Sequence, residues 1–98
     1  MSTHQIAVFS AKSYDERFLL KATVPTIEFI CHEVTLNPST AVMAQGYEIV
    51  SAFVNDDLSR ETLHILASGG TRLIALRCAG YNQVDLRAAK ELGVSVVN

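Results

Sequence analysis

The hydrophobic positions of this chain fall into five short runs separated by mixed segments. The runs are rich in β-branched and aromatic residues and are too short for helices. Such runs are typical of strands in a parallel sheet, because these strands are covered on both faces. We therefore expect strands at Ile6–Phe9, Ile27–Cys31, Ile49–Phe53, Leu73–Leu76 and Val94–Val97.

Two of the intervening segments carry clear helix signals. One opens at Ser13, and Glu16 follows at the spacing of a capping box, in which side chain and backbone cap each other. The other follows Ser59, a good N-cap residue, and continues as "RETLHILA" to a glycine pair at Gly69. We predict a helix in each segment.

The two remaining segments predict shorter helices. Pro38–Gln45 has Asn37 as a potential cap and proline at its first position, and the glycine that follows suits a left-handed stop. The last helix is expected from Asn82 to Gly93. Asp85 would lie in its first turn, where the helix dipole favours a negative charge.

The alternation of strands and helices predicts an α/β domain. With right-handed crossovers, the expected fold is a flavodoxin-like doubly wound parallel sheet of about five strands, with helices on both faces. The chain shows no internal repeat, linker or low-complexity segment, and 98 residues suffice for one domain.

Composition and charge narrow the function classes. Hydrophobic residues make up 49% and charged residues 18%, as in a globular protein. The net charge is −2 and the eight Lys and Arg are scattered, which argues against nucleic-acid and membrane partners. Two cysteines, no signal-peptide pattern and no membrane-spanning run favour a cytoplasmic protein with reduced thiols.

Ligands of open α/β sheets bind beyond the carboxyl ends of the strands, so we expect any site at those positions. Asp56 and Asp57 follow the third strand and could bind Mg²⁺ as in a response-regulator receiver. A receiver also needs acidic residues after its first strand, where this chain has Lys12. A charge pair at the start of a helix explains the two aspartates better, and we expect no metal site. The histidines show no metal-ligand spacing.

The fourth strand is followed by "RCAGYNQ", a turn with almost no side chains at Ala79 and Gly80. A ligand could approach the main chain closely there, and the N–H groups before the next helix would favour an anion. The residues alone leave two alternatives, a small-carboxylate site or a plain strand-to-helix turn.

The segment "RCAGYNQVDLRAAKELGVSVVN" resembles the D-specific 2-hydroxyacid dehydrogenases. Two further blocks, "IAVFSAKSYDERFL" and "AFVNDD", are similar to the NAD-dependent D-lactate dehydrogenases of fermenting bacteria within that family. The resemblance covers nearly the whole chain, with the blocks in the same order.

This resemblance implies that residues 1–98 are the N-terminal segment of a substrate (catalytic) domain with a flavodoxin-like fold. The family reduces pyruvate to D-lactate with NADH. Its cofactor domain binds NAD and supplies an arginine that holds the substrate and a glutamate that orients the catalytic histidine, and we expect that domain to be absent from this chain. The segment alone is therefore expected to be inactive. The complete enzyme is expected to act on a small 2-keto or 2-hydroxy acid as a homo-oligomer.

The resemblance also implies site residues. Main-chain N–H groups at Cys78, Ala79 and Gly80 would bind the substrate carboxylate, and Phe53 would line the pocket for the substrate side chain. Phe53 could instead be a core residue, and Arg77 is expected in a structural ion pair. The alternative function is a stand-alone flavodoxin-like or receiver-like binding module.

Overall fold

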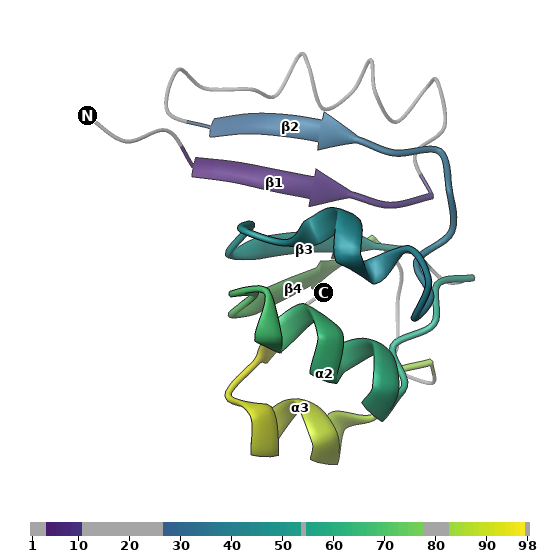
Figure 1. Ribbon diagram of the computed structural model, residues 1–98, viewed down its shortest axis with the longest axis vertical. Coiled ribbons are helices and arrows are strands. Elements are labelled where there is room, and N and C mark those ends of the chain that lie inside the picture. Colours follow the sequence, from purple (N-terminus) through teal and green to yellow (C-terminus); the bar gives the residue numbers. More distant parts are fainter. Residues whose placement is uncertain (1–3, 11–26, 54, 78–82, 98) are drawn as a thin grey trace.

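The computed structural model describes residues 4–10, 27–53, 55–77 and 83–97 (Figure 1). Within them, five parallel strands form one sheet in the order β2-β1-β3-β4-β5, which confirms the expected α/β fold. The strands lie within two residues of the predicted runs. They are β1 His4–Val8, β2 Ile27–Cys31, β3 Ile49–Ala52, β4 Leu73–Leu76 and β5 Ser95–Val97.

Three helical elements lie side by side along the sheet: the 3₁₀ helix η1 Ala41–Ala44 and the α-helices α2 Arg60–Ser68 and α3 Leu86–Leu92 (Figure 1). The helix predicted from Ser13 falls in residues 11–26, outside the described part of the chain. The expectation of a helix on the second face of the sheet therefore stays a prediction.

The predicted helix over Pro38–Gln45 is shorter than expected. Asn37 is not the cap of this helix, whose N-cap is Thr40. The Asn37 side-chain oxygen instead accepts from the N–H of Ser39 and of Thr40, at 2.9 and 3.0 Å, in the turn that precedes the helix. Thr40 however donates its hydroxyl to the Thr35 carbonyl at 2.7 Å, and the chain turns there before the 3₁₀ helix begins. The glycine that follows Gln45 has the predicted left-handed backbone, with φ of 89°.

Helix α3 begins at Leu86 and not near Asn82. Asp85 is its N-cap, and the carboxylate accepts from the N–H of Ala88 at 3.0 Å. The residue before the cap, Val84, forms a parallel bridge with Leu58, which holds this stretch extended and delays the helix. The helix ends as predicted, at a left-handed glycine.

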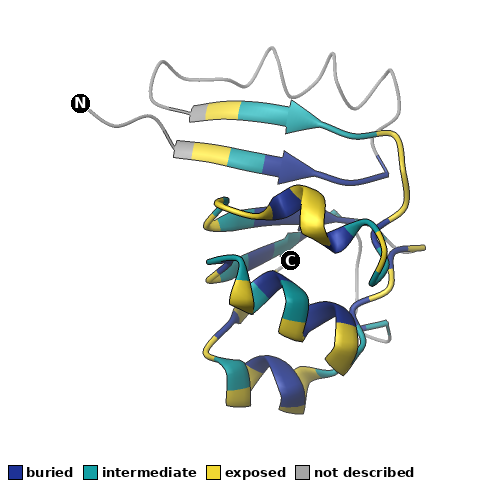
Figure 2. Ribbon diagram, viewed as in Figure 1, coloured by how far each residue is buried: buried dark blue, intermediate teal, exposed yellow. Residues whose placement is uncertain are grey.

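The core lies between the sheet and the helices (Figure 2). Strand β3 is central and mostly buried, and β1 is buried at its carboxyl end, whereas β5 is mostly exposed. The fully buried side chains include Phe9 directly after β1, Val50 and Ile74 from the strands, and Leu63 and Leu66 from α2. Since all strands run the same way, their carboxyl ends meet at one edge of this core.

Candidate functional site

The candidate site lies at the carboxyl edge of the sheet. Ser10, Phe53 and Arg77 lie just beyond the ends of β1, β3 and β4, three adjacent strands. Phe53 therefore occupies the edge where the sequence predicts a site. The turn that contains Cys78, Ala79 and Gly80 lies outside the described residues, so the carboxylate site stays a prediction.

A buried carboxylate, Asp56, organises this edge. The Ser10 hydroxyl and the Leu36 N–H both donate to its Oδ1, at 2.5 and 2.8 Å. The Phe53 N–H donates to its Oδ2 at 2.7 Å. With an exposed fraction of only 2%, Asp56 joins the chain after β1, the loop after β2 and the end of β3.

The interpretation of Asp56 and Asp57 as a charge pair at a helix start was therefore wrong for Asp56 and right for Asp57. Asp57 is exposed and accepts from the N–H of Ser59, the N-cap of α2, at 2.8 Å. Both Asp56 oxygens are engaged by protein donors, which speaks against a receiver-like Mg²⁺ site. Among the described residues, no cluster of three or more His, Cys, Asp or Glu could hold a metal ion.

Ser10 is the second residue whose role sequence reasoning missed. Its φ of 54° is left-handed, a conformation that is costly for a residue with a side chain. The Ser10 N–H donates to the Val34 carbonyl at 2.9 Å, and its hydroxyl donates to Asp56. These bonds hold Ser10 in its left-handed conformation. No periodic pattern in the sequence predicts that conformation, and the signal for it is a small polar residue at the end of a strand.

Phe53 is half-buried and held at both of its backbone groups. Its N–H donates to Asp56, and its carbonyl accepts from the Asp56 N–H at 3.0 Å and from Gln83 Nε2 at 3.4 Å. The guanidinium carbon of Arg77 lies 5.4 Å from the centroid of the Phe53 ring, which is within cation–π range. Phe53 is thus an ordered, partly accessible aromatic residue at the strand end.

Arg77 ties three strands together. Its N–H donates to the Ala52 carbonyl at 2.9 Å, its Nε donates to the Ser51 hydroxyl at 3.0 Å, and its Nη2 donates to the Phe9 carbonyl. These partners are neutral oxygen atoms and an aromatic ring, and the expected ion pair stays a prediction. Arg77 acts as a cross-strand connector within the described chain.

The described histidines do not form a ligand set. His64 is exposed on α2, and the His32 ring packs against Phe9 with the ring centroids 5.3 Å apart. His32 Nε2 is buried, and no described residue bonds it. Across the described ranges, no helix is long and apolar enough to cross a membrane.

The strand order and the ordered polar contacts at the carboxyl edge define a flavodoxin-like α/β domain with a candidate site beyond β1, β3 and β4. Comparison with known families then makes the assignment specific. The sequence model for "D-isomer specific 2-hydroxyacid dehydrogenase, catalytic domain" matches residues 6–98, and the chain belongs to this family.

Individual relatives agree with this family. The chain is 47% identical over 96 residues to a D-lactate dehydrogenase of Escherichia coli, a match that covers 95% of this chain and 29% of that protein. A 2-hydroxyacid dehydrogenase homologue of Haemophilus influenzae is also 47% identical, with 95% of this chain and 28% of the relative covered.

Solved structures show the same relationship. The apo-structure of D-lactate dehydrogenase from Escherichia coli superposes with a TM-score of 0.91 at 45% identity, covering 96% of this chain and 30% of that chain. The Salmonella D-lactate dehydrogenase superposes with a TM-score of 0.90 at 45% identity, and the match covers 96% of this chain and 29% of the Salmonella chain. This chain thus spans less than a third of the length of these relatives.

Proposed function

We propose that residues 1–98 form the N-terminal segment of the substrate domain of a dehydrogenase that reduces pyruvate to D-lactate with NADH. The observation that carries this proposal is the 47% identity to a D-lactate dehydrogenase over 95% of the chain. The similar overlap with two D-lactate dehydrogenase structures supports it.

In this proposal the segment binds the substrate and does not carry the catalytic groups. The main-chain N–H groups at Cys78, Ala79 and Gly80 hold the carboxylate of the keto acid. Such groups favour an anion because each presents a positive partial charge, and small side chains let the ligand approach. Arg77, which directly precedes Cys78 in the sequence, lies at the carboxyl edge, and this supports that role.

Phe53 would contact the methyl group of pyruvate. An aromatic side chain in that position leaves room for a small group and restricts longer ones, since a hydrophobic pocket discriminates by shape. Its ordered backbone and half-buried side chain support the assignment.

The cofactor belongs to the remainder of the protein. The 98 residues contain no G-x-G-x-x-G fingerprint, so NAD would be bound by a second domain. NADH supplies the hydride that reduces the keto carbon, and a histidine of the complete enzyme would supply the proton to the keto oxygen. We further propose that the complete enzyme is a cytoplasmic homo-oligomer.

The test is a steady-state assay of the complete protein that contains this segment. We expect pyruvate-dependent oxidation of NADH and D-lactate as the product by chiral analysis. If NADH is oxidised with another 2-keto acid but not with pyruvate, the family stands and the substrate is wrong. Absence of oxidation with every 2-keto acid would reject the dehydrogenase function.

A further inference from the structure

We propose that Arg77 is a positioning residue that fixes the ring of Phe53 and thereby limits the size of the substrate side chain. The proposal rests on the proposed function, in which Phe53 lines the side-chain pocket. It assigns a specificity role to a charged residue that need not touch the substrate.

The first argument is the anchoring of the Arg77 side chain. It starts at the end of β4, donates to the Ser51 hydroxyl on β3 and reaches the Phe9 carbonyl beyond β1. These are three neighbouring strands, with β3 in the middle. Two anchors on different strands leave the guanidinium plane little freedom to rotate.

The second argument is the place of the ring. Phe53 directly follows β3, the strand that the Arg77 side chain crosses, and the guanidinium carbon lies 5.4 Å from the ring centroid. Arg is suited to this task because its planar guanidinium can donate hydrogen bonds at its edge while its face packs on an aromatic ring. Lys would keep the charge but could not make both kinds of contact with the same geometry.

The third argument is that the backbone of Phe53 is already fixed. Asp56 holds its N–H at 2.7 Å, and Gln83 bonds its carbonyl at 3.4 Å. The remaining freedom is rotation of the side chain, and Arg77 restricts it from one side. Loss of the guanidinium should therefore let the ring turn away and enlarge the pocket without displacing the chain.

The test uses the complete enzyme and the ratio of kcat/KM for 2-ketobutyrate to that for pyruvate. We expect Arg77→Lys to shift this ratio roughly five- to tenfold toward 2-ketobutyrate, because one methylene in a pocket is discriminated by about that much or more. The KM for NADH should stay unchanged. Ser51→Ala, which removes one anchor, should shift the ratio in the same direction by a smaller factor.

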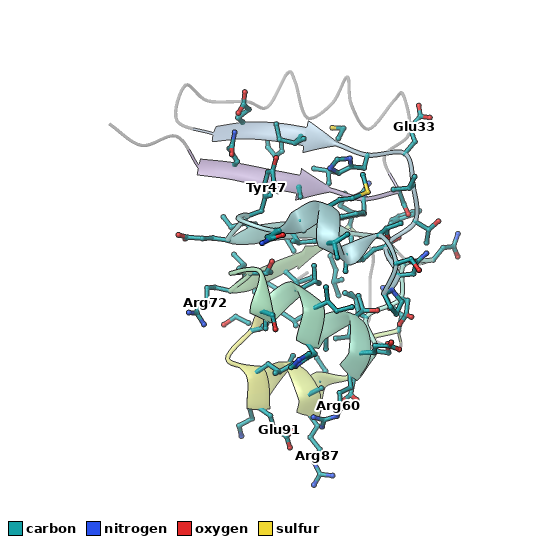
Figure 3. All side chains as sticks on the ribbon, viewed as in Figure 1. Glu33, Tyr47, Arg60, Arg72, Arg87 and Glu91 are labelled. Atoms are coloured by element: carbon teal, nitrogen blue, oxygen red, sulfur yellow. The ribbon has the colours of Figure 1, made fainter. Side chains whose placement is uncertain are left out.

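A double-mutant cycle separates positioning from a general structural role. Phe53→Ala alone should favour 2-ketobutyrate, and adding Arg77→Lys to it should produce no further shift, because the ring through which Arg77 acts is gone. The matched control is Arg72→Lys, the same substitution at an exposed position before the amino end of β4 (Figure 3). Its ratio should equal that of the wild type.

The outcomes distinguish the two proposals. If the wild type reduces pyruvate but Arg77→Lys keeps the wild-type ratio, or shifts it equally with and without Phe53, the positioning role is overturned. If Arg77→Lys does not fold, an unchanged ratio in Ser51→Ala overturns it instead. If the wild type does not reduce pyruvate or any other 2-keto acid, the failure belongs to the proposed function.

Discussion

The Asp56 side chain shows how much one buried carboxylate can organise at the edge of a sheet. Its two carboxylate oxygens accept hydrogen bonds from the backbone N–H groups of Leu36 and Phe53 and from the hydroxyl of Ser10. All three donors belong to residues that follow the carboxyl end of a strand. Without Asp56, both N–H groups would be left without that acceptor in a largely dry environment.

We predict that Asp56→Ala lowers the free energy of unfolding by about 3 kcal/mol, since loss of a buried acceptor leaves its donors unsatisfied. Denaturant-induced unfolding of the variant and of the wild type measures the difference. Asp57→Ala is the matched control, because Asp57 is exposed and bonds only one N–H among the described contacts of its side chain. Its loss should cost less than about 1 kcal/mol. Equal effects of the two substitutions would contradict the role given to Asp56.

A second prediction at this scale concerns Gly80. In the complete enzyme, Gly80→Val should raise the KM for pyruvate about tenfold or more, because the added side chain would keep the carboxylate from the main-chain N–H groups. Each hydrogen bond from such a group to a charged ligand contributes about 1.5–3 kcal/mol. The KM for NADH should change little, since the cofactor is bound elsewhere in the proposal. Steady-state kinetics with each substrate varied in turn decides. An unchanged KM for pyruvate would remove this turn from the carboxylate site.

At the scale of elements, local signals placed several helix ends correctly. Although the Ser59 side chain makes no cap hydrogen bond, the start of α2 after Ser59 and the stop of α3 at Gly93 fall where the sequence predicts them. The start of α3 does not, because it depends on the bridge between Leu58 and Val84. The two residues of that bridge are far apart in the sequence, so the local pattern that predicts a helix does not show their contact.

Helix α3 offers a test of a cap. Asp85→Ala removes the acceptor of the Ala88 N–H and should lower the free energy of unfolding by about 1 kcal/mol. Arg87→Ala is the control, since Arg87 is exposed on the same helix and alanine favours helix. Thermal unfolding of both variants measures the difference. If Arg87→Ala lowers the free energy of unfolding as much as Asp85→Ala does, the Asp85 cap does not stabilise the helix.

At the scale of the whole molecule, the fold could be predicted and the network at its carboxyl edge could not. Buried parallel strands leave apolar runs that the sequence shows directly. The donors of Asp56 are separated from it by 46, 20 and 3 residues, so no period or motif joins them. The site turn was recognised only through the resemblance to a family, because small residues in a bend fit a plain connection equally well.

The sheet order makes a last prediction about the stability of the whole chain. Strand β3 has neighbours on both sides, whereas β5 pairs only with β4 in the described chain. The Ser95 N–H donates to the Arg72 carbonyl on the β4 side, so the next N–H along β5, that of Val96, points away from the sheet. In hydrogen exchange followed by NMR on this chain, the Val50 amide should exchange at least about 100-fold more slowly than that of Val96, because central strands open only with global unfolding. Equal protection at the two amides would show that a further segment covers the β5 edge in solution. The sheet would then extend beyond the five strands described, and its stability would depend on that contact.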